Sequence, residues 1–170
     1  MAYELFGEKF HDIAFKETRS ISISNHPELP NDDFGFFEAY CDDEDCDCRR
    51  VMFNVASRNR GEFVAVIAYG WESKAFYAHW YRKNDPEIIR ELQGPTLNLG
   101  SQQSDLAPAL LKLVSDRLLK DPAYIERLKR HYRMFKERVD PEHFPPVMDK
   151  DADSHPVPQT RKRHRTRSER

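Results

Sequence analysis

The chain has 170 residues, of which 39% are hydrophobic and 33% are charged. This length favours a single domain, and the hydrophobic share lies below the roughly 45–50% of typical globular chains, so part of the sequence is expected to lie outside any core. The net charge of −2 conceals an asymmetry, because residues 1–50 carry −8, residues 51–110 carry 0 and residues 111–170 carry +6. The chain is therefore not a uniformly basic nucleic-acid binder, although a local basic surface is compatible with these charges.

The sequence shows neither a membrane span nor a secretory signal. Its longest apolar run, residues 63–69, is far shorter than the roughly 20 residues that cross a bilayer. The N-terminus has no basic region followed by an apolar one. The three cysteines all lie between positions 41 and 48, which does not make a disulfide framework. We therefore expect a cytoplasmic protein whose cysteines are thiols or metal thiolates.

Four segments have the patterns of β-strands. They are residues 18–24, 34–40, 50–57 and 62–69. In the second segment Phe36, Glu38 and Tyr40 share one face, and the fourth segment is apolar on both faces, which is typical of a central or helix-covered strand. Because the connections between the last three are short, we expect an antiparallel meander of about four strands.

Helical patterns begin after Gly70, marked by cap residues such as Ser73 and Asp85. The predicted helices span residues 73–82, 86–92, 104–120 and 122–139, and residues 95–103 are predicted to be a loop. From Asp140 onward prolines are frequent and apolar residues are few, so this part cannot bury a core. The sequence predicts an α+β fold, with a roughly four-stranded antiparallel sheet followed by C-terminal helices in a single domain of residues 1–144. Residues 145–170 are predicted to be a disordered, Pro-containing basic tail.

The strongest chemical signal is a C-x4-C-x-C loop between two predicted strands, formed by Cys41, Cys46 and Cys48. Thiolates are preferred ligands of zinc, and a turn between strands allows three sulfur atoms to converge on one ion. The acidic residues of the loop lack the spacing and the glycine of an EF-hand, so calcium is not indicated. The other interpretations are reduced structural cysteines and a redox or nucleophilic cysteine.

The cysteine loop belongs to a wider pattern that resembles a known family. The pattern comprises the Y-C-x4-C-D-C-R-R-V signature of residues 40–51 together with residues 8–14, 17–19, 94–97, 103–104 and 124–132. It is similar to a family of uncharacterised bacterial proteins, some relatives of which append a cysteine-rich SEC-C metal-binding motif. This chain has no cysteine after Cys48 and so lacks that appendage. The resemblance implies a shared scaffold over roughly residues 8–139, names no reaction, and places His11 and His131 within matching blocks.

The fourth ligand of a tetrahedral zinc site is not local to the cysteine loop. The predicted metal ligands are Cys41, Cys46, Cys48 and His11. The alternatives for the fourth position are His26, His79, Asp42, Asp47 and a water molecule.

The C-terminus offers a second candidate surface, because residues 161–170 contain six basic side chains and a single acid. Such clusters bind phosphate backbones through counterion release. The predicted nucleic-acid-binding residues are Arg161, Lys162, Arg163, Arg165 and Arg167. The basic residues of the helix 122–139 form a weaker candidate, since they spread over more than one face, and Tyr124 and Tyr132 are predicted to be core residues rather than stacking platforms.

These features predict a metal-binding module, with a structural zinc, whose basic C-terminus engages nucleic acid. One alternative is a metal-dependent hydrolase or redox enzyme with an open metal position at the cysteine loop and Glu38 or Asp47 as a base. Another is a regulatory protein-interaction domain. The common nucleotide-binding, zinc-protease and serine-hydrolase signatures are absent from the sequence.

Overall fold

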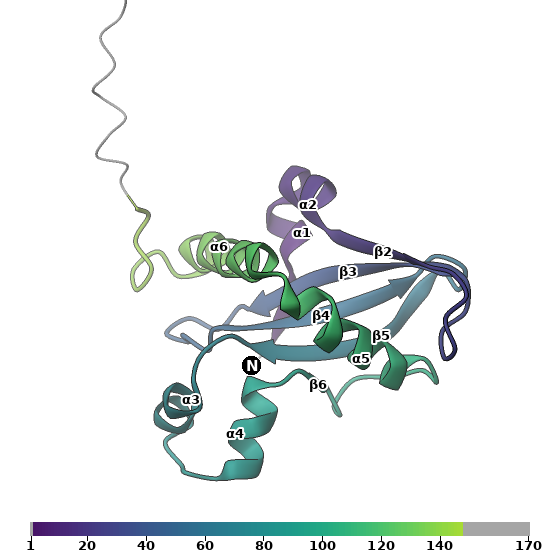
Figure 1. Ribbon diagram of the computed structural model, residues 1–170. Helices are drawn as coiled ribbons and strands as arrows, with labels where there is room; N and C mark the ends of the chain where they lie inside the picture. Colours follow the sequence, from purple (N-terminus) through teal and green to yellow (C-terminus); the bar gives the residue numbers. More distant parts are fainter. Residues whose placement is uncertain (1, 148–170) are drawn as a thin grey trace, which may run out of the picture.

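The computed structural model describes residues 2–147 and shows an α+β fold built on one antiparallel sheet (Figure 1). The sheet has six strands in the order β1-β3-β4-β5-β6, with β2 also paired to β3. The strands are β1 (Tyr3–Leu5), β2 (Arg19–Ile23), β3 (Asp32–Cys41), β4 (Arg50–Ser57), β5 (Glu62–Gly70) and β6 (Thr96–Leu97). The α+β prediction is confirmed, and the four predicted strands are β2 to β5.

The meander β3-β4-β5 forms the centre of the sheet, and its alternation places one set of side chains on the inner face. On β3, Phe34, Phe36, Glu38 and Tyr40 are buried, whereas Phe37, on the opposite face, is 39% exposed. Helices α5 (Ala107–Asp116) and α6 (Pro122–Val139) cover the inner face, with α6 against β3 and β4 and α5 against β5. The main core therefore lies between the sheet and these two helices, and a separate small cluster is formed by Ala39, Met52 and Ala68.

Helix α6 packs through a stripe of residues at helical spacing, as predicted. Tyr124, Leu128, Tyr132 and Phe135 are buried, which confirms the two tyrosines as core residues. The single helix predicted over residues 104–120 is wrong at both ends. Helix α5 begins only at Ala107, and Arg117, with φ −121°, separates α5 from a 3-10 turn at Leu118–Lys120.

Helices α3 (Lys74–Tyr81) and α4 (Pro86–Gln93) form a hairpin at the end of β5. Their predicted caps are confirmed. The Ser73 hydroxyl accepts a hydrogen bond from the Phe76 amide at 3.1 Å, and the Asp85 carboxylate accepts from the amides of the first turn of α4. Tyr77 of α3 is fully buried and its hydroxyl donates to the Arg49 carbonyl at 2.9 Å, so this hairpin is packed against the start of β4.

The N-terminal elements were not predicted, because each is too short to show a periodicity. They are β1, α1 (Phe6–Lys9) and α2 (His11–Glu17). Strands β1 and β2 both pair with the outer edge of β3: β1 pairs with Ala39 to Cys41 and β2 with Asp32 to Phe36. Neither strand pairs with Phe37 or Glu38, and α1 and α2 connect the two strands beside this gap (Figure 1).

The segment 95–103, predicted to be a loop, is fixed to the sheet, although only its two β6 residues form a strand. The side chain of Gln103 accepts a hydrogen bond from the Val66 amide and donates one to the Val66 carbonyl, both at 3.0 Å. Of the predicted tail, the structure describes only residues 145–147. No helix within the described residues is long and apolar enough to cross a membrane.

Candidate metal centre and a buried histidine network

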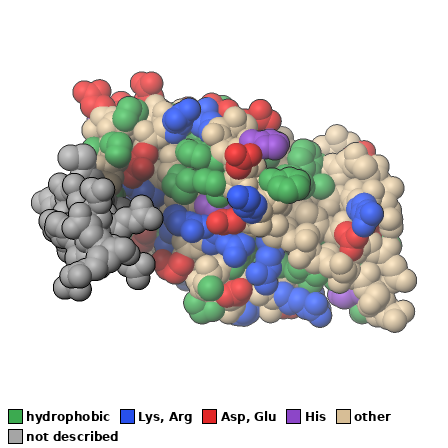
Figure 2. Space-filling model, turned by 90° about the horizontal axis from the view of Figure 1, so that it is seen from above, with side chains coloured by type: hydrophobic (Ala, Val, Ile, Leu, Met, Phe, Trp, Pro, Cys, Tyr) green, Lys and Arg blue, Asp and Glu red, His purple; other side chains and the backbone are tan. Residues whose placement is uncertain are grey.

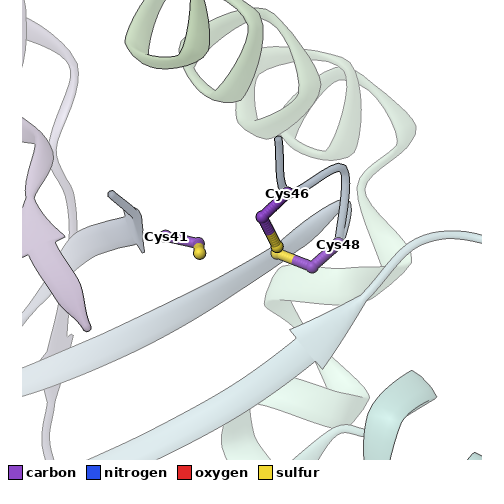
Figure 3. Close-up of side chains that lie close together, drawn as sticks. All are labelled: Cys41, Cys46 and Cys48. Atoms are coloured by element: carbon purple, nitrogen blue, oxygen red, sulfur yellow. The ribbon is translucent and has the colours of Figure 1, made fainter. Parts of the chain in front are cut away.

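The three cysteines converge where β3 ends and the chain turns into β4. Cys41 is the last residue of β3, and Cys46 and Cys48 lie in the loop before Arg50 (Figure 3). Their sulfur atoms lie within 4.8 Å of one another and form no disulfide. In a tetrahedral zinc site with bonds of about 2.3 Å, sulfur atoms are separated by about 3.8 Å, so a small adjustment brings these three onto one ion. The structure therefore provides a cluster that can bind a metal.

Helix α6 holds the cysteine loop in place through contacts that need no ion. The Lys136 ammonium donates to the Asp43 carbonyl at 2.7 Å, and the Asp45 amide donates to the Asp140 carboxylate at 2.9 Å. The Tyr132 hydroxyl donates to the Asp47 carboxylate at 3.0 Å. Two residues of α6 and the residue that ends the helix thus fix the loop, so that the thiols are brought together by the fold itself.

The thiols differ in charge because they share hydrogen bonds. Hydrogen bonds from Cys41 and Cys48, with a smaller contribution from the Lys136 charge, lower the pKa of Cys46 to about 3 although burial opposes this. The pKa of Cys41 is raised, chiefly by its hydrogen bond to Cys46, and that of Cys48 is raised by hydrogen bonds to Cys41 and Cys46 and then by burial. The shared hydrogen bonds therefore favour the thiolate form at Cys46 over the other two thiols.

The cluster is enclosed. Cys41 and Cys48 are fully buried, whereas Cys46 is partly exposed. The Tyr3 hydroxyl lies 3.9 Å from the Cys48 sulfur, and burial, followed by the neighbouring Cys48 thiol, raises the pKa of Tyr3 above its ordinary value. Tyr3 is therefore a neutral hydrogen-bonding neighbour of the thiols.

The predicted fourth ligand His11 is not brought to the cysteines. His11 lies on α2, its side chain is 87% exposed, and it does not belong to the group of converging thiols. His26 is also elsewhere, since its Nδ1 accepts hydrogen bonds from two amides of the turn after β2. His79 is exposed near the end of α3.

The two aspartates proposed for the same position differ in their partners. Both carboxylate oxygens of Asp47 are engaged, one by Tyr132 and the other by Arg49 at 2.8 Å. Asp42 directly follows Cys41, and its Oδ1 is buried without a hydrogen-bond partner. Asp42 lies outside the group of atoms within 4.8 Å, but it carries the unsatisfied oxygen nearest in sequence to the thiols.

A second polar cluster closes the loop on its outer side. His143 Nε2 lies 2.9 Å from an Asp45 oxygen, and its Nδ1 lies 3.0 Å from an Asp140 oxygen. The hydrogen bond and charge of Asp140 raise the pKa of His143. Because both carboxylates face the imidazole, this cluster is sufficiently explained as an ion-paired clasp between the cysteine loop and the residues after α6.

The sequence did not predict a network centred on His131 of α6. This histidine is 1% exposed, and its Nδ1 lies 2.6 Å from Oε2 of Glu38 and its Nε2 2.8 Å from Oε2 of Glu17. The Tyr40 hydroxyl donates to the same Glu38 oxygen at 2.7 Å, and the Phe6 ring stacks on the imidazole at 4.3 Å. A carboxylate within the apolar inner face of a predicted strand was the signal for this network, because such a group requires a buried partner.

The basic residues of α6 are largely engaged within the protein. Arg127 and Arg130 contact Glu17, Arg133 pairs with Glu137, and Lys136 is buried. Figure 2 shows Lys and Arg side chains interspersed with Asp and Glu on the face that carries α2 and α6. The predicted nucleic-acid-binding residues Arg161, Lys162, Arg163, Arg165 and Arg167 lie outside the described residues.

Comparisons with family models, with curated proteins and with solved structures found no match to this chain. The resemblance based on the Y-C-x4-C-D-C-R-R-V signature therefore stays a prediction, and the candidate sites rest on the geometry of this structure.

Proposed function

We propose that the protein is a zinc-binding module in which Cys41, Cys46 and Cys48 bind one structural ion. The observation that carries the proposal is the convergence of three thiols from two sides of a loop to within 4.8 Å. Zn²⁺ suits this site, because it binds thiolate ligands and a structural role needs no change of oxidation state. The ion would join the end of β3 to the start of β4.

The surroundings of the thiols support a bound cation with several anionic ligands. Lys136 is fully buried and reaches the loop, so its positive charge offsets the negative charge of a three-thiolate site. Asp42 carries the unsatisfied carboxylate oxygen, and we propose it as the fourth ligand after a small side-chain adjustment. His11 is not proposed for this role, because it lies exposed on α2.

A structural role fits this geometry better than the hydrolase or redox alternative. A catalytic zinc needs an open position that a substrate can reach, and two of the three thiols here are fully buried. The bases suggested for such an enzyme are engaged elsewhere: Glu38 binds His131 and Tyr40, and Asp47 binds Arg49 and Tyr132.

The proposal is tested by the metal content of full-length protein purified without chelator. We expect about one equivalent of zinc and, after exchange with Co²⁺, the thiolate charge-transfer and intense visible bands of a tetrahedral site. Cys46→Ser should remove both signals, and Asp42→Asn should alter the visible bands, whereas the exposed neighbour Glu44→Gln should not. Wild-type protein that contains no metal and gives no cobalt bands would contradict the proposal.

Two lysines of α6, Lys136 and Lys129, provide a matched pair of variants that tests whether the Lys136 charge supports metal binding. Lys136→Met removes the buried ammonium and should weaken Zn²⁺ binding by about tenfold or more, as expected for the loss of one nearby charge. Lys129→Met should leave the affinity unchanged, because the Lys129 amine pairs with Glu126 at the surface. Competition with a chromogenic chelator measures both affinities, and equal values for the two variants would contradict the role of Lys136.

We further propose that the basic segment 161–170, rather than α6, engages nucleic acid. Its six basic side chains support this proposal, and the pairing of Arg127, Arg130 and Arg133 with acids makes α6 the poorer candidate. Protein lacking residues 150–170 should bind a DNA or RNA duplex more weakly and with a flatter dependence on salt concentration. Fluorescence anisotropy at several salt concentrations measures this, and binding that is equally strong without the segment would contradict the proposal.

A further inference from the structure

A cavity of about 370 Å³ lies between the N-terminal helices and the edge of β3, and none of the residues proposed above to bind zinc lines it. Its size lies within the range of about 300–1,000 Å³ that is typical of small-molecule sites. Much of its wall is apolar and is formed by Leu5, Phe6, Ala14, Phe15 and Phe37. It occupies the gap in the edge of β3, between the residues that pair with β1 and those that pair with β2.

The polar wall of the cavity contains an unsatisfied acceptor. Glu38 lines the cavity and is only 6% exposed. Its Oε2 is bound by the Tyr40 hydroxyl and by His131, whereas its Oε1 is buried without a hydrogen-bond partner. A buried carboxylate oxygen without a donor is costly, so a group that donates a hydrogen bond to this atom gains a favourable interaction.

The position of Glu38 is fixed by the network behind it. His131 contacts Glu38 through Nδ1 and Glu17 through Nε2, so both ring nitrogens are occupied. Phe6 stacks on the imidazole and also lines the cavity. The carboxylate of Glu38 is therefore held by a rigid arrangement at the cavity wall and does not depend on a mobile surface side chain.

The charged and aromatic side chains that line the cavity favour a cationic ligand. Among the described residues, the lining contains the acids Glu8 and Glu38, the histidines His11 and His131, and no Lys or Arg. Arg127 and Arg130 contact Glu17 instead. Phe15 and Phe37, two of the few large apolar side chains exposed in the described part of the chain, stand in the wall at 84% and 39% exposure. Aromatic faces attract cations, and apolar surface of this kind is suited to a ligand ring.

We propose that this cavity binds a small organic amine, whose ammonium group donates a hydrogen bond to Oε1 of Glu38 and whose ring-sized apolar body packs between Phe6, Phe15 and Phe37. Such a ligand donates a hydrogen bond to Glu38, its positive charge is attracted by the acids Glu8 and Glu38, and its apolar body packs against the exposed rings of Phe15 and Phe37. An anion of the same shape is repelled by Glu8 and Glu38, and a neutral ring compound lacks the charge.

The first test compares three probes of equal size against full-length protein by calorimetry: benzylamine, benzyl alcohol and benzoate. We expect benzylamine to bind at least tenfold more tightly than benzyl alcohol, and benzoate to show no binding. Equal affinity of benzylamine and benzyl alcohol, or no binding of benzylamine, would overturn the proposal. The latter is the outcome if an ordered water alone satisfies Glu38.

Two variants test whether benzylamine binds in this cavity. Glu38→Gln should weaken benzylamine binding at least tenfold, and Glu28→Gln, an exposed acid of the loop after β2, should leave it unchanged. Because Glu38 is buried and its replacement can impair folding, Ala14→Met provides a second variant that fills the cavity from α2 and leaves the carboxylate intact. Unchanged benzylamine affinity in folded Ala14→Met protein would show that the amine binds elsewhere and would overturn the proposal.

Discussion

Glu17, His131 and Glu38 connect three elements through one imidazole ring. Glu38 comes from β3, His131 from α6 and Glu17 from the end of α2. Both ring nitrogens of His131 face carboxylate oxygens, so the imidazole bridges the two acids. Arg127 and Arg130 contact Glu17 and supply positive charge on the solvent side. The end of α2 is thus attached to the core by charged hydrogen bonds.

This attachment predicts a pH-dependent effect of Glu17→Gln. Burial opposes ionisation of Glu17, but the hydrogen bond from His131 and the charge of Arg130 outweigh it and hold the pKa of Glu17 below its ordinary value. The resulting stabilisation is therefore fully present above the unfolded-state pKa of about 4.3 and is lost as the pH falls through the lower folded-state pKa. At pH 7 we expect Glu17→Gln to reduce the free energy of unfolding by about 1–2 kcal/mol.

Urea denaturation of both proteins between pH 7 and pH 3 measures this difference. It should shrink toward the acid end, whereas the control Glu28→Gln, whose carboxylate is exposed on the loop after β2, should differ little from wild type throughout. A difference for Glu17→Gln that stays constant with pH would show that packing, and not charge, is responsible.

The candidate metal residues were predicted only as far as they are local in sequence. Cys41, Cys46 and Cys48 lie within eight positions, so their spacing alone indicated a common site. The choice of His11 depended on a side chain from another element, and sequence spacing does not fix the distance between elements. The same reason explains why Glu38 and His131, separated by 93 residues, were not predicted to be partners.

At the scale of elements, the hairpin of α3 and α4 depends on one close approach at the end of β5. A Cβ atom added to Gly70 would lie 2.1 Å from the Tyr77 hydroxyl oxygen and 2.7 Å from the Leu92 carbonyl oxygen. The backbone carbonyl belongs to α4 and cannot rotate away. Arg50, opposite Gly70 on β4, also donates to this carbonyl at 2.8 Å.

Gly70→Ala is therefore expected to reduce the free energy of unfolding by about 2 kcal/mol or more, because overpacking against backbone forces the hairpin outward. The matched control is Gly100→Ala, where the new Cβ would be 4.0 Å from its nearest neighbour, Asn98 Oδ1. Its effect should lie within about 0.5 kcal/mol. Thermal or urea denaturation compares the two variants, and equal stabilities would contradict the close approach.

Elements with local signals were predicted well, and those without them were not. Helices α3, α4 and α6 are preceded by the N-cap residues Ser73, Asp85 and Asp121, whose side chains accept hydrogen bonds from the first turn. Helices α1 and α2 have no side-chain cap hydrogen bonds, and strand β1 has only three residues. Their positions are set by pairing to β3 and by the network around His131, which are tertiary interactions.

At the scale of the whole molecule, α6 organises both candidate sites from one helix. Its C-terminal half fixes the cysteine loop through Tyr132 and Lys136, and His131 on the same helix holds Glu38 at the amine-binding cavity. The acidic first fifty residues are thereby balanced partly by the basic residues of α6, through Glu17 with Arg127 and Arg130 and through the loop with Lys136. The charge asymmetry of the sequence is therefore partly an internal pairing between distant segments.

The sequence by itself determined the elements that carry local patterns and the grouping of the three cysteines, because alternation, caps and spacing act over a few residues. The tertiary structure alone decided which side chains complete each site. It placed His11 at the surface, left Oδ1 of Asp42 and Oε1 of Glu38 without donors, and joined His131 to two carboxylates. These outcomes depend on packing α6 and the N-terminal helices against the same strand. The sequence can show that a buried carboxylate such as Glu38 needs a partner, but the order of the residues does not identify a partner that is distant in the chain.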